Sequence, residues 1–452
     1  MEKKCKPESI IGKAGTGAVL SLDAIGLQDT FLTSNVGDSF FQFKNIQHTQ
    51  FTKYSASIKL NNDGSTNWPF NQKIMFNLNP KEMGDILQNM YIKCTLPPLT
   101  GGAQYSNDVG LTMINQIQLN ADDVILEIIK TDWNVMYTEL YYTKEEIEIY
   151  YAITNVDRVN GGNLYIPLHF FFSRRHSSSF TSSEHGSSYF KPGFLTCAAH
   201  KHRNLTVMIT FNPISFFSSA TSVSMTNMYL VTDEIVLGDA ERRYLRNNIQ
   251  KNLVSFTRND SVYPVTQTPI VANLTPNIPV KVIHWFIRNK KYENSADSTY
   301  FNNRFNFSNQ DYQLPFSNTN TLAQQETNFP IISQTLIYLN GVQLTGLCQS
   351  ATVRNQKDGS YYFKFNQPYN HSLCTPDRNI YTYSFCLDPA NSQPSGSLDF
   401  GQMISRSTFL NCSLYSLKNT SVVINSYNMY MFYTGFATVT YSNGLVSQDF
   451  GW

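Results

Sequence analysis

Two groups of side chains in this sequence have the residue types that could carry out chemistry. Glu145, Glu146 and Glu148 place three carboxylates close together, and His200 and His202 stand two positions apart. Carboxylates that hydrolyse a bond face each other across a substrate cleft, and neighbours along one helical run do not provide that gap. Zinc takes three or four ligands, and no third ligand is evident beside the histidines. We therefore interpret the carboxylates as a solvated face and the histidines as structural.

A glycine-rich stretch and a lone histidine near the N-terminus also resemble chemical sites. Residues Gly12–Gly17 read GKAGTG, but a phosphate-binding loop has its lysine after the last glycine, followed by a hydroxyl residue that opens a helix. His48 lies between polar residues, which is typical of a hydrogen-bonding residue at a strand edge. We expect no catalytic residue, no metal and no cofactor, and we expect residues 1–20 to form an arm.

Cysteine usage and the N-terminal composition indicate where the chain is made. The 7 cysteines are scattered, odd in number and without a C-x-x-C pair, which favours free thiols in a reducing compartment over a disulfide framework. The N-terminus has no apolar core of the signal-peptide kind, and no run approaches the ~18 apolar residues of a membrane span. Asn306 and Asn370 are kept as glycosylation candidates among several sequons, although synthesis inside the cell argues against their use.

Composition favours a large protein built from strands. At 452 residues the chain exceeds the size at which one hydrophobic core stops growing, so two domains are expected. Charged residues make up only 15% and aromatic residues 14%, which suits many strands joined by polar turns. The net charge of +1 gives no overall field that would attract nucleic acid. We therefore expect no direct nucleic-acid binding.

Hydrophobic patterns in the first half predict strands and one helix. Leu205–Phe211 alternates apolar and polar residues, the pattern of a half-buried strand. The continuous aromatic run Tyr165–Ser173 predicts a strand buried on both faces. Apolar residues from Trp133 to Leu140 recur at helical spacing, and Thr131 or Asp132 can cap that helix.

At the start of the second half, Asp239 has a carboxylate that can cap a helix. Asn289–Asn320 is polar and predicts a long surface loop. The dipeptide Asn340-Gly341 predicts a hairpin tip, and Val422–Phe436 predicts a closing strand. Ile380–Phe400 begins as a strand that runs to Leu387, because its residues alternate between two faces.

That last stretch ends in a shaped corner. Asp388-Pro389 breaks the strand, since proline offers no N–H to a ladder, and residues 393–396, Gln-Pro-Ser-Gly, form a turn. The string YTYSFCLDPANSQPSG resembles the "YSF-L-P-QPSG" signature of the major capsid proteins of nucleocytoplasmic large DNA viruses, the chlorella-virus, iridovirus, marseillevirus and mimivirus-like groups.

Further family-like motifs follow in order from about Ala24 to Gly435. The matching residues are Gly26, Gln28, Asp29, Leu32, Thr33, Phe41, Thr49, Phe51, Gly84, Asp85, Asp132, Trp133, Pro167, Leu168, Phe170, Phe172, Asp239, Glu241, Arg242, Arg243, Trp285, Tyr383, Ser384, Phe385, Leu387, Pro389, Gln393, Pro394, Ser395 and Gly396. Two departures stand out: the loop Ser177–Ser188 replaces a short link, and Ile278 stands where the family often has histidine.

The resemblance implies an all-β fold of two consecutive eight-stranded antiparallel jelly rolls with short helices in the connections. It places the first roll at residues 21–238, a linker helix at 239–250 and the second roll at 251–452. It implies a structural major capsid protein, not an enzyme, that forms homotrimeric pseudo-hexagonal capsomers tiling an icosahedral shell of a large double-stranded DNA virus. Implied partners are neighbouring capsomers, minor capsid, cement and penton proteins and, indirectly, an internal viral membrane, in virions assembled in the host cytoplasm or virus factory.

Three alternatives remain open at this point. A minor or paralogous capsid component of the same kind of virus would share every motif named above. A carbohydrate-binding jelly-roll module would show clustered exposed aromatic residues and monomeric behaviour. An enzyme would require turnover that is lost when one carboxylate or histidine is replaced.

Overall fold

The computed structural model describes residues 26, 48–60, 68–174, 191–259, 262–308, 331–345, 362–371, 373–391, 394–414 and 426–449. All elements below belong to one compact unit, Gln50–Trp452. Several expectations lie outside the described residues: the N-terminal arm with its GKAGTG stretch, the loop Ser177–Ser188, and the motif residues Gln28, Asp29, Leu32, Thr33, Phe41 and Gln393.

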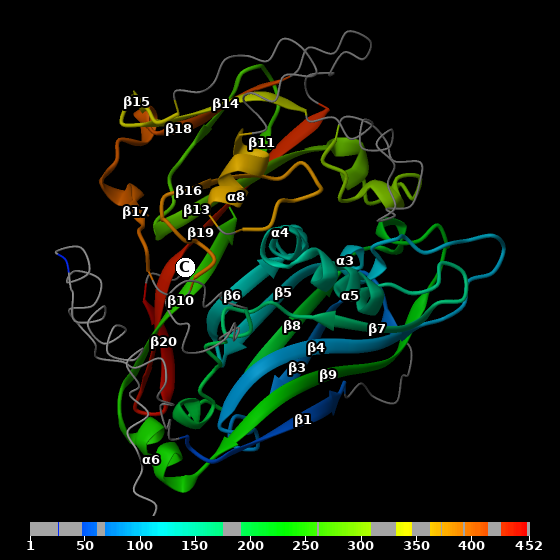
Figure 1. Cartoon of the computed structure of the whole chain (residues 1–452). Helices are drawn as coiled ribbons and strands as arrows, with labels where there is room; N and C mark the ends of the chain where they lie inside the picture. The colour runs from blue at the N-terminus through cyan, green and yellow to red at the C-terminus, as the bar shows by residue number, and fades with distance from the viewer. Residues whose placement is uncertain are drawn as a thin grey trace, which may run out of the picture. The chain divides into compact units, whose positions relative to one another are not determined.

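The first half of the fold consists of two antiparallel sheets (Figure 1). Its strands are β1 (Phe51–Lys59), β2 (Trp68–Pro69), β3 (Lys73–Leu78), β4 (Ile86–Leu96), β5 (Ile114–Ala121), β6 (Val124–Lys130), β7 (Gly162–Pro167), β8 (Leu205–Phe211) and β9 (Ser224–Leu237). One sheet has the order β1-β9-β4-β7, with β2 paired to β9, and the other has the order β3-β8-β5-β6. The residues that alternate inward along these strands form a buried core, as in the clean alternation of β3.

The second half is again built from two antiparallel sheets. Its strands are β10 (Gln250–Asn259), β11 (Tyr263–Pro264), β12 (Ile270–Asn273), β13 (Pro279–Asn289), β14 (Ile332–Leu339), β15 (Val342–Gln343), β16 (Tyr381–Ser384), β17 (Leu398–Asp399), β18 (Phe409–Leu414), β19 (Tyr427–Ser442) and β20 (Leu445–Asp449). The orders are β10-β19-β13-β16 and β12-β18-β14-β15, while β11, β17 and β20 pair off these paths.

The two halves share one strand order. In the first half β1 pairs with β9, and β9 pairs with β4. In the second half β10 pairs in the same way with β19, and β19 pairs with β13. Two four-strand paths facing each other in this order are the jelly-roll arrangement. The predicted all-β fold of two antiparallel jelly rolls is confirmed, and the short strands β2, β11, β17 and β20 are additional to these paths.

Short helices occupy the connections. The α-helices are α3 (Val109–Thr112), α4 (Thr131–Tyr141), α5 (Lys144–Thr154), α6 (Asp239–Asn247) and α8 (Gln367–Asn370). A π-helical turn, η5, spans Tyr362–Asn366, and 3-10 turns are η1 (Cys197–Ala199), η2 (Ile214–Phe216), η3 (Lys290–Glu293), η4 (Phe301–Asn303), η6 (Phe400–Gln402) and η7 (Ser405–Ser407). Figure 1 shows α3, α4 and α5 gathered beside the first-half strands, at the side that faces β13 and β19.

Two predicted helix caps are wrong, although both helices are present. The N-cap of α4 is Lys130, and the Thr131 hydroxyl donates instead to the carbonyl of Ile114 at the start of β5. The N-cap of α6 is Gly238, and Asp239 is its first helical residue. Strand β6 leads directly into α4, and only Gly238 separates β9 from α6, so each helix begins before its polar residue can cap it.

The aromatic run at 165–173 is buried, but it is not one strand. Strand β7 ends at Pro167, and the backbone then turns, with the N–H groups of Ser173 and Arg174 both donating to the carbonyl of Phe170. The ring of Phe171 stacks 5.1 Å from that of Phe256 in β10. Burial of this run therefore comes from packing between connections and strands rather than from a sheet buried on both faces.

Three second-half predictions need adjustment, and one is confirmed. The strand predicted to reach Leu387 ends at Ser384, whose hydroxyl donates to the carbonyl of Cys386 and closes a turn, so Leu387 is 80% exposed. Residues 290–308 are not a surface loop, because Phe305 and Phe307 are buried in the core. Strand β19 continues past the predicted end to Ser442. The Asn340-Gly341 hairpin is confirmed, with both residues at positive φ.

Candidate functional site: a buried ionic seam between the two halves

Helix α4 carries side chains of the first half to the second half. Trp133 packs its ring 5.6 Å from that of His284 in β13 and 6.2 Å from that of Phe432 in β19. Its neighbours on the helix, Asp132 and Glu139, form ion pairs with second-half arginines. We call these ion pairs, together with the Arg174–Glu127 pair, the ionic seam.

Arg378 makes the most connections in the seam, and only 3% of its side chain is exposed. Its Nε donates to Glu139 Oε1 at 2.9 Å, and its Nη2 donates to Asp108 Oδ2 at 3.0 Å and to the Tyr151 hydroxyl at 3.1 Å. Its Nη1 donates to the carbonyl of Phe305 at 3.0 Å. The guanidinium thus joins two first-half carboxylates to the second-half chain.

Arg288 makes a second connection from β13. Its Nη1 and Nη2 reach the two oxygens of Asp132 at 2.6 and 3.3 Å, which is a bidentate pair. Its Nε donates to Glu293 at 3.0 Å, and its guanidinium lies 4.6 Å from the centre of the Tyr430 ring. Bidentate geometry restricts orientation as well as distance, so this pair fixes how α4 meets β13.

Arg174 makes a third connection, and here the arginine belongs to the first half and contacts the second. Its Nη2 pairs with the fully buried Glu127 of β6, and its Nη1 donates 2.7 Å to the carbonyl of Ser255 in β10. The second oxygen of Glu127 accepts the backbone N–H of Phe171 at 2.8 Å. The carboxylate therefore holds both the arginine and the aromatic turn that packs on β10.

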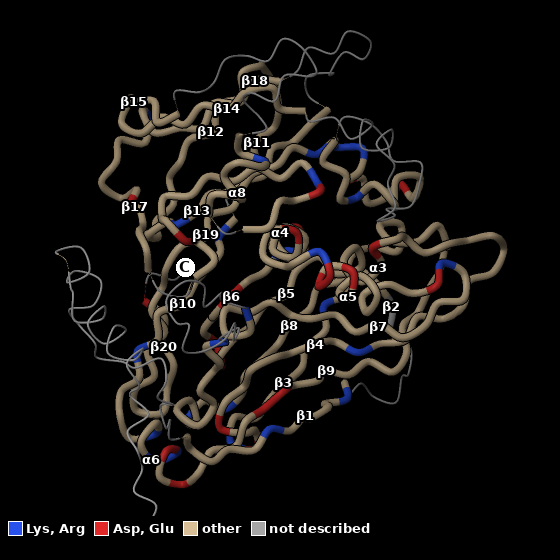
Figure 2. The backbone as a smooth tube through the Cα atoms, in the orientation of Figure 1, with Lys and Arg blue, Asp and Glu red and all other residues tan. Residues whose placement is uncertain are grey.

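Electrostatics keep the second-half arginines of the seam charged, whereas burial raises the pKa values of Glu127 and Glu139, and Arg174 and Arg378 oppose that rise. Burial alone would lower the pKa values of Arg288 and Arg378, but surrounding acidic and phenolic groups outweigh it and hold both pKa values well above the usual value. Figure 2 shows acidic and basic positions meeting around α4 and α5, while most of the strands carry neither. Buried pairs of this kind add little net stability relative to apolar packing, but breaking one is costly, so they select a single arrangement of the parts they join.

A second junction joins two motifs that the sequence places far apart. Asp85 is 7% exposed; its Oδ1 accepts from Arg242 Nε and its Oδ2 from the N–H of Leu237, both at 2.8 Å. The N–H of Gly84 donates to Glu234 in β9. The first turn of α6, which includes Glu241, is thereby anchored to the start of β4, while Arg243 is exposed.

The corner motif of the second half is structural. Trp285 stacks at 6.0 Å on Tyr381, and Tyr383 lies 5.1 Å edge-on to Phe385. The Ser395 hydroxyl accepts a hydrogen bond from the backbone N–H of Asp388. The carbonyl of Pro389 accepts one from Lys281 Nζ at 2.9 Å.

Gly396, with φ of +142°, lies so close to Phe385 that a Cβ would meet its carbonyl at 3.1 Å. Pro394, which precedes this turn, is exposed, as are Gly26 and Thr49, and Phe51 at the start of β1 is 53% exposed.

Most seam residues were missed by sequence reasoning. Of its charged members, only Asp132 belongs to the family-like motifs. A usable signal existed for one of them: Glu127 interrupts the apolar run VILEIIK, and a lone charge in such a run needs a buried partner. Arg288 stands at the polar end of its run, where no such signal exists. Asp108, Glu139 and Arg378 carry no comparable signal.

The acid–base and metal alternatives find no support in the described parts of the chain. Glu146 closes a capping box with Thr143 at the start of α5, and His202 bonds to Asp122 at 2.9 Å and to the N–H of Val446. The described residues hold no group of three or more metal-ligating side chains, and the cysteines among them are free. No described helix is long and apolar enough to cross a bilayer.

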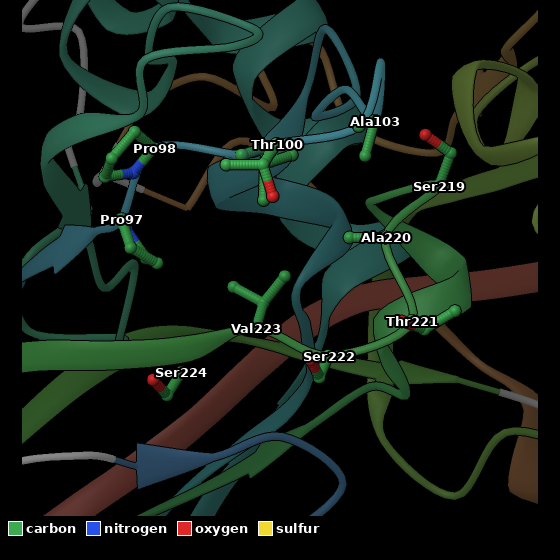
Figure 3. A pocket seen from close by; sticks show the side chains of 12 residues that line it. Pro97, Pro98, Thr100, Ala103, Ser219, Ala220, Thr221, Ser222, Val223 and Ser224 are labelled. Atoms are coloured by element: carbon green, nitrogen blue, oxygen red, sulfur yellow. The ribbon is translucent and has the colours of Figure 1, made fainter.

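An open pocket beside the first-half strands also lacks reactive groups. Figure 3 shows it between residues 97–103 and 219–224, with a volume of about 500 Å³. Its lining is proline, alanine, glycine, serine, threonine, leucine and valine, so it holds no titratable side chain. Of the two glycosylation candidates, Asn370 is exposed and stays a prediction, whereas Asn306 is 1% exposed and leaves a sugar no room in this fold.

Comparison with known proteins gives one consistent answer. The family model for large eukaryotic DNA virus major capsid proteins matches residues 241–443, and that for the major capsid protein N-terminus matches residues 39–181. A major capsid protein of Phaeocystis pouchetii virus is 22% identical, with 94% of this chain and all of that protein covered. One from Paramecium bursaria Chlorella virus 1 is 24% identical, with 91% of each covered.

Solved structures agree on the fold. A quasi-atomic model of the PBCV-1 virus capsid aligns with a TM-score of 0.66 at 18% identity and covers 91% of this chain and 99% of that chain. The Faustovirus major capsid protein aligns with a TM-score of 0.65 at 10% identity and covers 95% of this chain and 97% of that chain.

Proposed function

Because this chain belongs to the family of large eukaryotic DNA virus major capsid proteins, we propose that it forms homotrimeric, pseudo-hexagonal capsomers that tile an icosahedral shell. The domains proposed for this role are an arm at residues 1–20, a first jelly roll at 21–238, a linker helix at 239–250 and a second jelly roll at 251–452. The shell belongs to a virion, assembled in the host cytoplasm or a virus factory.

The observation that carries the proposal is the ionic seam between two halves of equal strand order. Three copies of a chain with two such halves supply six similar units around a threefold axis, which approximates a hexagon. That outline requires the two halves of each chain to keep one mutual orientation. The deeply buried Arg378–Glu139 pair and the bidentate Arg288–Asp132 pair supply this constraint, because another orientation leaves a charge unpaired.

The proposed partners follow from the same role. They are other copies of this chain, neighbouring capsomers, and minor capsid, cement and penton proteins, with an internal viral membrane contacted indirectly. A net charge of +1 supports the absence of direct nucleic-acid binding. The role is structural and needs neither catalysis nor a cofactor.

Light scattering on the purified full-length chain tests the proposal. We expect one species at three times the 51.5 kDa chain mass, which persists on dilution. A folded monomer at every concentration would contradict it and favour a carbohydrate-binding module. A trimer that cannot form extended arrays on concentration, but adds to arrays of another capsid protein, would favour the minor capsid alternative.

A further inference from the structure

A buried lysine meets a buried asparagine beside the seam. Lys364 lies in η5 with 8% of its surface exposed, and Asn379, just before β16, is 2% exposed. The lysine Nζ donates to Asn379 Oδ1 at 2.9 Å. The carboxamide carbon Cγ is one bond beyond that oxygen, so the amine lies close to an electrophilic carbon.

The surrounding chain holds the asparagine in place. Asn379 Nδ2 donates to the carbonyl of Phe307 at 3.4 Å, which turns Oδ1 toward the lysine. Lys364 Nζ also donates to the carbonyl of Asp377 at 3.3 Å. Glu139 of α4 accepts the N–H of Asp377 at 2.9 Å and the Nε of Arg378 at 2.9 Å. The residues just before Asn379 are therefore anchored, and Glu139 acts as a positioning residue.

The lysine is in a state that can react. Burial lowers the pKa of Lys364 to about 8, although Glu139 and Asp377 oppose this shift. An amine with such a pKa is partly neutral near neutral pH, and only the neutral amine has a free lone pair. The ring of Phe365 lies 5.1 Å from Nζ, and the low exposure of both side chains excludes bulk water.

We propose that Lys364 and Asn379 join in an intramolecular isopeptide bond. The neutral amine attacks Cγ of Asn379, and a C–N bond forms to Nζ. A proton passes from Nζ to the departing amide nitrogen, the old C–N bond breaks, and ammonia leaves. One amine and one carboxamide become one secondary amide plus ammonia, so nothing is oxidised or reduced and no co-reactant is needed.

Lys281 provides an internal comparison. It is buried at 2% exposure, and burial likewise lowers its pKa to about 8. Its Nζ, however, donates to the Ser255 hydroxyl at 2.7 Å and to the Pro389 carbonyl at 2.9 Å. A hydroxyl and a backbone carbonyl are not side-chain acyl donors, so we expect Lys281 to stay unmodified.

The bond would close a covalent loop from 364 to 379 that contains Arg378, and would so tie the residue next to Arg378 to η5. This inference does not depend on the proposed capsid role, since it concerns chemistry within one chain. The bond can be present in a chain that proves to be a monomer, and it can be absent from a chain that forms trimers.

Intact-mass measurement of the denatured full-length chain tests the bond. We expect a mass lower than that of the sequence by one ammonia, and a digest in which the Lys364 peptide is joined to the Asn379 peptide. The full sequence mass would overturn the proposal. A loss of ammonia without the joined peptide would also overturn it, because another asparagine would then be the source.

Matched variants test whether the lost ammonia comes from a bond between Lys364 and Asn379 or from another pair of residues. Lys364→Arg and Asn379→Ala should each regain the full mass expected for its sequence, whereas Lys281→Arg should still lose one ammonia. Persistence of the loss in Lys364→Arg would contradict the assignment. If a variant fails to fold, the digest of the unaltered chain still decides the question.

Discussion

The two halves of the chain share a strand order, but they contribute opposite charges where they meet. The first half supplies carboxylates from the helical connections, namely Asp108, Asp132 and Glu139. The second half supplies the arginines that pair with them, Arg288 from β13 and Arg378 from the segment before β16. Arg174 is the exception, since it pairs within the first half and reaches the second only through a backbone carbonyl.

This difference shows how two similar folds avoid symmetric pairing. Identical halves would place like charges opposite each other, which repel. Opposite charges make the first half complementary to the second and not to itself. The strand order sets the fold of each half, and the connections set which faces meet.

The largest expected effect comes from removing the charge that joins the halves. Arg378→Met leaves the Glu139 and Asp108 carboxylates buried without their partner, and we expect a loss of roughly 3–5 kcal/mol in the free energy of unfolding. Urea denaturation measures it. Arg406→Met, at an exposed arginine of η7, is the matched control and should change stability by no more than about 0.5 kcal/mol.

A double variant sharpens the same comparison. If Arg378 and Glu139 act as a pair, Arg378→Met combined with Glu139→Met should cost less than the sum of the single losses, because neither charge is then left buried alone. Simple additivity in the denaturation curves would show that the pair is not coupled.

A smaller effect is expected where one half requires glycine and the other does not. At the first paired position of β13, Val280 faces Gly435, whereas Ile86 of β4 faces Ile235. A Cβ on Gly435 would lie 2.3 Å from the Pro279 carbonyl. Gly435→Ala should cost about 3 kcal/mol in unfolding free energy through overpacking, while Ile235→Ala should cost roughly 2–5 kcal/mol through the cavity that it leaves. An unchanged midpoint for Gly435→Ala would refute this close approach.

The seam should also respond to acid through His284. Neither of its ring nitrogens has a hydrogen-bond partner among the described residues, and burial, assisted by Lys281, lowers its pKa to about 3. The unfolded chain binds this proton below its usual pKa of 6.5 and the folded chain does not, so stability is lost as pH falls from 6.5 toward 3.

His284→Phe should remove that contribution, which amounts to about 2 kcal/mol at pH 5 and close to none at pH 8. Unfolding measured at both pH values checks it. An equal change at the two values would mean that packing against Trp133, rather than titration, accounts for the effect.

The smallest expected effect lies at the junction of α6. The side chain of Arg242 is 31% exposed, so solvent screens its pairing with Asp85. Arg242→Met should therefore lower stability by no more than ~1 kcal/mol. The exposed neighbour Arg243→Met gives the baseline, and a loss as large as that of Arg378→Met would show that this junction ranks with the seam.

Much of the fold could be predicted from the sequence because local patterns specify it. Alternation predicted β8, helical spacing predicted α4, and Asn340-Gly341 predicted the hairpin between β14 and β15. Boundaries were less reliable: the aromatic run after Pro167 and the strand after Ser384 turn back through side-chain and backbone hydrogen bonds that alternation cannot reveal.

By itself, the sequence determined strands such as β8, helix α4 and the β14–β15 hairpin, since each depends on neighbours along the chain. The jelly rolls and the helix between the halves were implied by the resemblance of its motifs to a known family. Only the tertiary structure decided the seam and the Lys364–Asn379 contact. Glu139 and Arg378 lie 239 positions apart, and nothing local marks either as buried. Their pairing exists because two separately folded sheets bring connections from distant segments to one water-excluded place, where each charge requires a partner.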